Sequence, residues 1–189
     1  MKPLLENCSL ETLRKGQNAL GELMKAARHT QVRVKRHDFP LFSAAWVLPR
    51  DARREGVVLY LHGGGYTCGG LEYALGFGAA LADECGVRVF CAAYRLAPEH
   101  RFPAAVEDAA AAYRYLLGKG YPPEQISLCG ESAGGGSVKI IDFILRCPHN
   151  GIVNARSLNL QPGSHVLLGK KTVYIRIRDI GYARGVCTR

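Results

Sequence analysis

Strand-like and helix-like segments alternate along this chain from Gly56 to about residue 138. The run that Gly56 opens, the run 87–94 and the run 125–132 are rich in the apolar residues of buried strands. Residues 71–85 and 104–120 have the composition of helices, with glycines at their ends. This alternation predicts an α/β fold with a mostly parallel sheet and helices on both faces. In such sheets, ligands bind at the carboxyl ends of the strands.

The regions on either side of this alternation are less regular. Residues 9–28 have mostly helical spacing of their leucines, and two short strand-like runs follow, separated by a turn at 38–40. After residue 138, a helix can continue until Pro148, 151–165 is loop-like, and 166–180 predicts a small hairpin. No repeat or low-complexity segment is present.

The net charge of +9 is not spread evenly over the chain. Residues 1–138 hold 16 Lys and Arg against 14 Asp and Glu, a net charge of +2, and residues 139–189 hold 9 against 2, a net charge of +7. The excess describes the tail, where a solvated strand face explains the arginines better than a nucleic-acid patch does. We therefore expect no nucleic-acid partner.

The cysteines and the apolar segments limit the protein's environment. The seven cysteines form no CxxC pair, so we expect reduced thiols, no disulfide framework and no metal site. No apolar run reaches the ~18 residues of a membrane span, and the N-terminus lacks the apolar core of a signal peptide. These features predict a cytoplasmic protein.

A serine lies between two glycines where the strand 125–132 ends. Gly130-Glu131-Ser132-Ala133-Gly134 is a G-x-S-x-G motif, in which small residues leave room for a sharp strand-to-helix turn. The motif alone is weak, but it has a strand before it and a plausible helix after it. Ser132 is therefore a candidate nucleophile.

A second glycine motif, His62-Gly63-Gly64-Gly65, follows the strand that Gly56 opens. Successive glycines let backbone N–H groups approach a substrate oxygen, where they stabilise the oxyanion formed in ester cleavage. No Walker loop is present, because no G-K-[ST] follows, and the spacing of a dinucleotide fingerprint is not met. Hydrogen bonds that orient this loop are a better role for His62 than direct catalysis.

These motifs, together with "AAYRLAPEHRFPAAVEDA", resemble the hormone-sensitive-lipase-like branch of the α/β-hydrolases, over about residues 30–138. The resemblance implies an acetyl esterase or carboxylesterase, with Ser132 as nucleophile and an oxyanion hole from Gly64, Gly65 and Ala133, with Gly63 as a further candidate. It also implies that residues 94–103 shape the sheet edge beneath the site. The N-terminal helix would belong to a cap over the acyl pocket.

The sequence does not identify the acid and the histidine of a catalytic triad. These enzymes order the triad as serine, acid, histidine, and 57 residues follow Ser132. Asp142 would lie about 15 Å along the same helix. His149 and His165 lie farther along the chain, and Asp179 follows both histidines. We therefore expect a fold cut short after the nucleophile helix, with one sheet edge uncovered.

Two functions fit these observations. The first is a serine hydrolase of small carboxylic esters that needs no cofactor, built from a cap-like segment (1–30), part of a hydrolase domain (31–138) and a divergent basic tail (139–189). The second is a catalytically dead remnant that keeps only ligand or partner binding. The sequence gives neither the acyl and alcohol groups of the substrate nor the oligomeric state.

Overall fold

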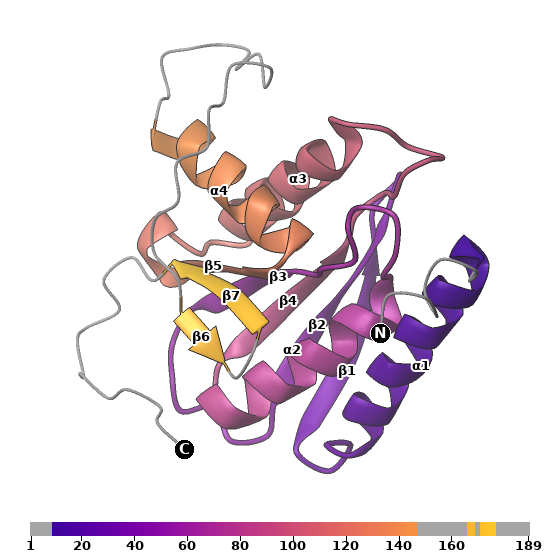
Figure 1. Cartoon of the computed structure of the whole chain (residues 1–189). Helices are drawn as coiled ribbons and strands as arrows, with labels where there is room; N and C mark the ends of the chain where they lie inside the picture. Colours follow the sequence, from indigo (N-terminus) through magenta and orange to yellow (C-terminus); the bar gives the residue numbers. More distant parts are fainter. Residues whose placement is uncertain (1–8, 147–165, 169–170, 177–189) are drawn as a thin grey trace.

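The computed structural model describes residues 9–146, 166–168 and 171–176 (Figure 1). The described strands are β1 (Val32–Asp38), β2 (Ser43–Pro49), β3 (Val57–Leu61), β4 (Arg88–Ala93), β5 (Ile126–Glu131), β6 (Val166–Leu168) and β7 (Lys171–Arg176). The described helices are α1 (Leu10–Ala26), α2 (Leu71–Cys85), α3 (Ala104–Gly118) and α4 (Ala133–Arg146), with a short 3₁₀ helix at Pro123–Gln125. Each segment predicted before residue 138 is confirmed, with bounds shifted by a few residues at most.

The strands form one sheet in the order β1-β2-β4-β3-β5-β7-β6. The central strands β4, β3 and β5 are parallel, because a helix carries the chain back across the sheet after β3 and again after β4. The outer pairs β1–β2, β2–β4, β5–β7 and β7–β6 are antiparallel. The predicted parallel arrangement therefore holds at the centre, and the sheet as a whole is mixed.

Helices cover both faces of this sheet (Figure 1). Successive side chains of a strand point to opposite faces, so Leu59 and Leu61 pack with α3 and α4, whereas Tyr60 packs with α2. All three side chains are buried. This double coverage explains why β3 is apolar almost without interruption.

Helix α1 packs mainly against α2. Ser9 caps it by accepting a hydrogen bond from the N–H of Thr12 at 3.2 Å. A Cβ atom added to Gly76 would lie 2.7 Å from Cα of Gly21, so the two helix backbones are in direct contact. Glu72 of α2 also forms an ion pair with Lys25 of α1.

After residue 138, the structure describes residues 139–146, 166–168 and 171–176, and they form the elements that the sequence predicts there. Helix α4 continues without a break to Arg146, and the predicted hairpin is present as the antiparallel pair β6–β7. Strand β7 also pairs with β5, with Glu131 opposite Val173 and Leu128 opposite Arg176. The edge of β5 that we expected to be uncovered is therefore occupied, since β7 offers backbone groups to the unpaired ones.

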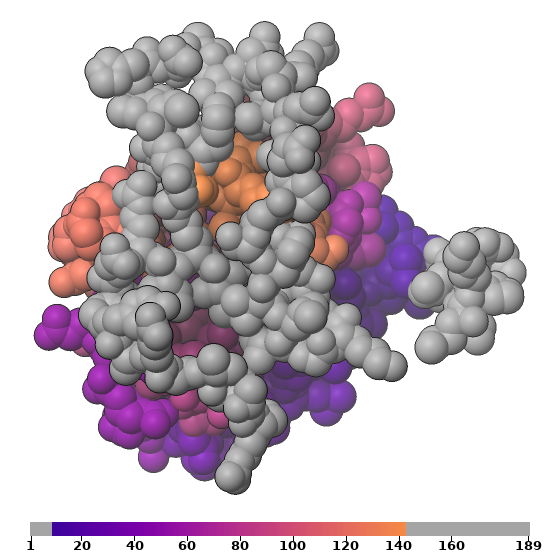
Figure 2. All heavy atoms as spheres, turned by 60° about the vertical axis from the view of Figure 1, so that its left-hand side comes forward, coloured from indigo at the N-terminus to yellow at the C-terminus, as the bar shows by residue number. Residues whose placement is uncertain are grey.

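The described cysteines are free thiols, with Cys68, Cys91 and Cys129 buried and Cys85 half-buried. The other three, Cys8, Cys147 and Cys187, lie outside the described residues. Of the described helices, none combines the length and apolarity that a membrane span needs. In the space-filling view, α4 (orange) lies toward the centre, and the indigo atoms of the N-terminal part lie toward the right and the bottom (Figure 2).

Candidate active site

Ser132 occupies the turn between β5 and α4 in a backbone conformation that is unusual for its type. Its φ of +50° lies in the left-handed region, and the residue is exposed. Glu131, immediately before it, is buried. A non-glycine residue held at positive φ at the end of a central strand is how a nucleophile elbow presents its hydroxyl.

The two glycines of the motif are required by close backbone contact. A Cβ on Gly134 would lie 2.0 Å from the carbonyl oxygen of Leu61, at the end of β3. A Cβ on Gly130 would lie 2.6 Å from the carbonyl carbon of Gly134. Helix α4 therefore begins directly against β3, which leaves Ser132 at the tip of the turn.

The glycine loop, residues 62–70, follows β3 and lies beside this turn, because β3 and β5 are neighbours in register, with Leu61 opposite Gly130. Gly64 (φ +121°), Gly65 (φ +64°) and Tyr66 (φ +61°) all have positive φ. The loop closes on itself where the N–H groups of Thr67 and Cys68 donate to the Gly64 carbonyl, at 3.2 and 2.9 Å.

The backbone N–H of Gly63 already has a partner. It points to Oε1 of Glu131 at 3.4 Å, inside the protein. The same carboxylate oxygen accepts hydrogen bonds from Tyr73 at 2.8 Å and Tyr60 at 3.4 Å. Burial, followed by the nearby Glu131 charge, raises the pKa of both tyrosines, which therefore remain donors. The N–H of Gly63 is thus bonded inside the core, unlike the N–H groups of Gly64 and Gly65.

His62 supports the glycine loop from below. Its Nδ1 lies 2.7 Å from the Gly63 carbonyl, so this nitrogen carries the proton and donates it. The ring stacks on Tyr94 at 4.2 Å, and the hydroxyl of Tyr94 donates to the His62 carbonyl. Complete burial lowers the pKa of His62 to about 4. This arrangement is the loop-orienting role that we expected.

The structure brings no triad partner to Ser132 among the residues that it describes. His62 is enclosed, and no hydrogen bond joins the Ser132 hydroxyl to a described histidine or carboxylate. Asp142 lies on α4, well beyond its first turn, as the sequence predicted. His149, His165 and Asp179 lie outside the described residues.

The segment 94–103 connects the glycine loop to the rest of the fold. The guanidinium of Arg95 forms a two-point ion pair with the buried carboxylate of Asp108 on α3, at 2.8 to 3.0 Å. The N–H of Ala97 donates to the Tyr66 carbonyl at 2.8 Å. Glu99 pairs with Arg14 of α1, and this guanidinium lowers the pKa of Glu99 to about 2. The resemblance implied a role for 94–103 beneath the site, and these contacts support that role.

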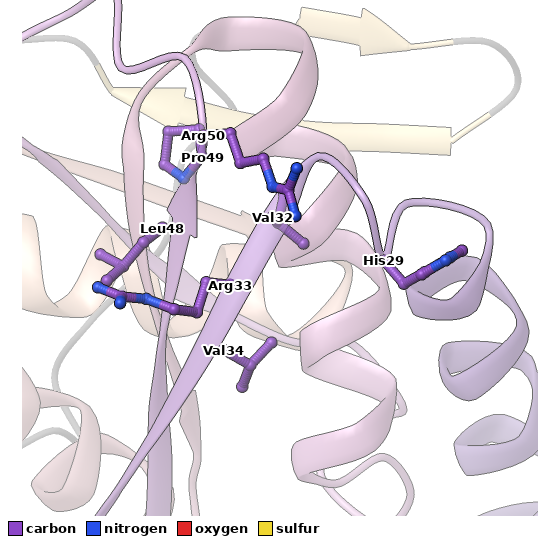
Figure 3. A pocket seen from close by; sticks show the side chains of 7 residues that line it. All are labelled: His29, Val32, Arg33, Val34, Leu48, Pro49 and Arg50. Atoms are coloured by element: carbon purple, nitrogen blue, oxygen red, sulfur yellow. The ribbon is translucent and has the colours of Figure 1, made fainter.

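A hollow of about 650 Å³ lies elsewhere, on the outer strands β1 and β2 (Figure 3). It is lined by His29, Val32, Arg33, Val34, Leu48, Pro49 and Arg50. The side chains of Arg33 and Arg50 extend in different directions, so they do not converge on one ligand. Ser132 and the glycine loop take no part in its lining.

Sequence reasoning missed the polar groups that hold the site together. Four residues contact the glycine loop across separations of 11 to 68 residues: Glu131, Tyr73, Tyr94 and Arg14. Glu131 was read only as part of the G-x-S-x-G motif. Its position at the end of the apolar run 125–132, which the sequence predicts as a buried strand, is the signal that indicates a buried carboxylate.

Comparison with known proteins identifies relatives over the described core. Residues 58–149 match a family model described as the α/β-hydrolase fold. An acetyl-hydrolase from Streptomyces hygroscopicus is 50% identical over 95 residues, which are 50% of this chain and 31% of that protein. An ethyl acetate hydrolase from Pseudomonas putida is 40% identical over 88 residues, which are 44% of this chain and 28% of that protein.

Solved structures give the same picture. A bacterial esterase of the hormone-sensitive lipase family is 35% identical, with a TM-score of 0.63, and the match covers 77% of this chain and 48% of that one. A hyperthermophilic esterase from the archaeon Pyrobaculum calidifontis is 31% identical, with a TM-score of 0.64, and the match covers 75% and 48%. The chain thus spans about a third of the length of these curated relatives and about half of these solved structures.

Proposed function

Because residues 58–149 of this chain match the α/β-hydrolase family, we propose that it carries the nucleophile and oxyanion hole of a serine hydrolase for small carboxylic esters. The observation that supports this most directly is the exposed, positive-φ Ser132 at the end of a central parallel strand. Two relatives are named an acetyl-hydrolase and an ethyl acetate hydrolase, and these names favour a short acyl chain.

The proposed chemistry is acyl transfer. The Ser132 oxygen attacks the ester carbonyl carbon and forms a C–O bond, while the carbonyl oxygen becomes an oxyanion and the hydroxyl proton passes to a base. The N–H groups of Gly64, Gly65 and Ala133 are the proposed donors to this oxyanion. Collapse of the intermediate breaks the ester C–O bond, and the alcohol leaves with the proton that the base had taken up. Water then attacks the acyl-serine, which releases the carboxylic acid and restores the Ser132 hydroxyl.

Gly63 was also a candidate donor in the sequence. Its hydrogen bond to Glu131 favours a supporting role instead, because an N–H held by a buried carboxylate is not available to substrate.

The proton of Ser132 needs an acceptor. In the family order, acid and histidine follow the serine, and His149 and His165 are the histidines of this chain in that position. Separate His149→Ala and His165→Ala variants would show whether either supports the reaction.

The proposed division of the chain is a cap-like segment (1–30), a hydrolase part (31–138) and a basic tail (139–189), and helix α1 supports the first of these. Its Gln17 and Asn18 lie against the glycine loop, since Cβ atoms on Gly64 and Gly70 would lie 3.2 and 3.0 Å from their side-chain oxygens. We place α1 in a cap over the acyl pocket.

The direct test is reaction with a fluorophosphonate probe, which labels activated serines. We expect one label per chain, located on Ser132 by peptide mass spectrometry, and none in Ser132→Ala. Substitution of another exposed serine, as in Ser9→Ala, should leave the labelling of Ser132 as it is in the wild type. A wild-type chain that takes up no probe at Ser132 would reject the proposal.

The alternative is a catalytically dead remnant that keeps ligand or partner binding. The observation in its favour is that Ser132 has no histidine partner among the described residues. Turnover of p-nitrophenyl acetate separates the two functions. A rate that falls in Ser132→Ala supports the hydrolase, whereas identical background rates in both proteins support the remnant. An oxyanion hole without a base can still leave a residual acceleration of about 10³–10⁴ over water.

A further inference from the structure

Arg14 of α1 holds two loops of the proposed active site with a single guanidinium group. Its Nε donates to the carbonyl of Thr67 at 2.7 Å, and one terminal nitrogen donates to the carbonyl of Ala97 at 2.9 Å. Both terminal nitrogens also bind the Glu99 carboxylate at 2.8 Å. The partners lie 53, 83 and 85 residues farther along the chain.

The Thr67 carbonyl belongs to the turn that closes the glycine loop. The N–H groups of Thr67 and Cys68 both donate to the Gly64 carbonyl, so the peptide that Arg14 holds is continuous with the one that fixes Gly64. The hydroxyl of Thr67 also donates to the Gly64 carbonyl, at 3.3 Å. A shift of Thr67 would therefore shift the Gly64 carbonyl and the Gly64–Gly65 peptide that follows it.

The second loop is tied to the first in the same place. The N–H of Ala97 donates to the Tyr66 carbonyl, one residue before Thr67. Arg14 holds the carbonyl of this same Ala97, and Glu99 completes its planar fork. The guanidinium thus fills a gap between two loop carbonyls, where only an extended planar donor can satisfy all three partners.

The ion pair alone does not account for this arrangement. Glu99 has 52% of its side chain exposed, and ion pairs at such sites contribute little to stability. The Arg14 side chain is only 26% exposed, and its bonds to the two carbonyls are partly buried. The contact is therefore suited to fixing the loops in place.

We propose that Arg14 is a positioning residue, through which the docking of α1 sets the conformation of the glycine loop. This inference rests on the proposed function, because the loop matters for catalysis only as an oxyanion hole. It predicts that the oxyanion donors are correctly placed only when α1 is docked.

Amide hydrogen exchange of the full chain tests the link without any need for activity. The amides of Thr67 and Cys68 report the turn directly, because both are bonded to Gly64. In Arg14→Ala, we expect them to exchange roughly tenfold faster or more. In Arg14→Lys, which keeps the charge but not the fork, exchange should stay within about threefold of Arg14→Ala.

The matched control is Lys15→Ala, the next residue on α1, whose side chain is 76% exposed and pairs with Glu11. It should leave exchange at both amides at the wild-type rate. Wild-type exchange in Arg14→Ala, or full restoration by lysine, would overturn the proposal.

A second variant separates the fork from a general loss of α1. Gly21→Leu displaces α1 by another route, because even a Cβ there would lie 2.2 Å from the Glu72 carbonyl oxygen. If Arg14 links α1 to the loop, adding Arg14→Ala to Gly21→Leu should not further accelerate amide exchange at Thr67 and Cys68. Additive effects would contradict the link.

The probe reaction then connects the loop to chemistry. Arg14→Ala should lower the maximal rate of Ser132 labelling about tenfold, with little change in the probe concentration at half-maximal rate. If wild-type Ser132 takes up no probe, the proposed function fails, while the exchange at Thr67 and Cys68 still decides the role of Arg14.

Discussion

The carboxylate of Glu131 accepts a 2.8 Å hydrogen bond from the hydroxyl of Tyr73, directly behind the exposed Ser132. Adjacent residues of one strand end thus have opposite surroundings: one is buried in a polar cluster and the other faces outward. The same carboxylate accepts a hydrogen bond from the Gly63 N–H, so the Ser132 turn and the glycine loop share one buried acceptor.

Removal of the Tyr73 hydroxyl should destabilise this cluster. Tyr73→Phe takes one donor from a buried carboxylate, and we expect the free energy of unfolding to fall by about 1.5–3 kcal/mol. Urea unfolding measures the change. Tyr115→Phe is the control, because it keeps the ring stack on Phe90 and should have little effect. If both variants lose the same free energy of unfolding, the hydrogen bond to Glu131 makes no contribution of its own.

Ser132 should show a conflict between stability and reactivity. Ser132→Gly relieves the strain of the positive φ, whereas Ser132→Ala keeps the Cβ that causes it. We therefore expect the free energy of unfolding to be about 1 kcal/mol higher for Ser132→Gly than for Ser132→Ala. Neither variant should react with a fluorophosphonate probe. Thermal unfolding of the two variants side by side is the measurement, and equal midpoints would argue against strain at this turn.

A methyl group at position 134 should disrupt the turn. Gly134→Ala places a Cβ 2.0 Å from the Leu61 carbonyl oxygen, so α4 must move away from β3. We expect a loss of roughly 3 kcal/mol or more, as other overpacked sites show. Gly118→Ala, at the end of α3, meets no atom within 4 Å and should be neutral or slightly stabilising. Circular dichroism during thermal unfolding compares the two.

His62 should make the stability depend on pH below neutrality. The folded chain keeps this ring neutral down to about pH 4, whereas the unfolded chain takes up the proton near the ordinary pKa of 6.5. Protons therefore favour the unfolded state between these values, and stability falls as the pH drops from 6.5 to 4, by about 3 kcal/mol.

His62→Asn should flatten this dependence. Asparagine can still donate to the Gly63 carbonyl, but it does not titrate. His100→Asn, at an exposed histidine, should keep the wild-type slope. Urea unfolding at several pH values gives all three curves, and an unchanged slope in His62→Asn would assign the titration to other groups.

Much of the fold follows from local patterns. The apolar run at β3 and the glycine at the end of α2 predicted their elements closely, because backbone propensity and burial act over a few residues. The sharp turn at Ser132 was also predictable, since Gly130 and Gly134 are required by close contacts that leave no room for a side chain.

The contacts that hold the site were not predictable in this way. Arg14 binds the carbonyls of Thr67 and Ala97 only because α1 packs along α2. Nothing in the local sequence of α1 indicates this packing position. The pairing of β7 with β5 is a similar case, since an edge strand can be filled by any compatible segment. Such contacts depend on topology rather than on propensity.

The distance in sequence between α1 and its partners has a consequence for synthesis on the ribosome. Helix α1 is translated before α2, against which it packs. The last residue that Arg14 binds, Glu99, is translated after α2. Until α2 has emerged, the nascent helix lacks the surface against which it packs, and its apolar side remains open to chaperones. Among the described elements, α1 is thus made earliest, but Arg14 acquires its last partner only after Glu99 has been added to the chain.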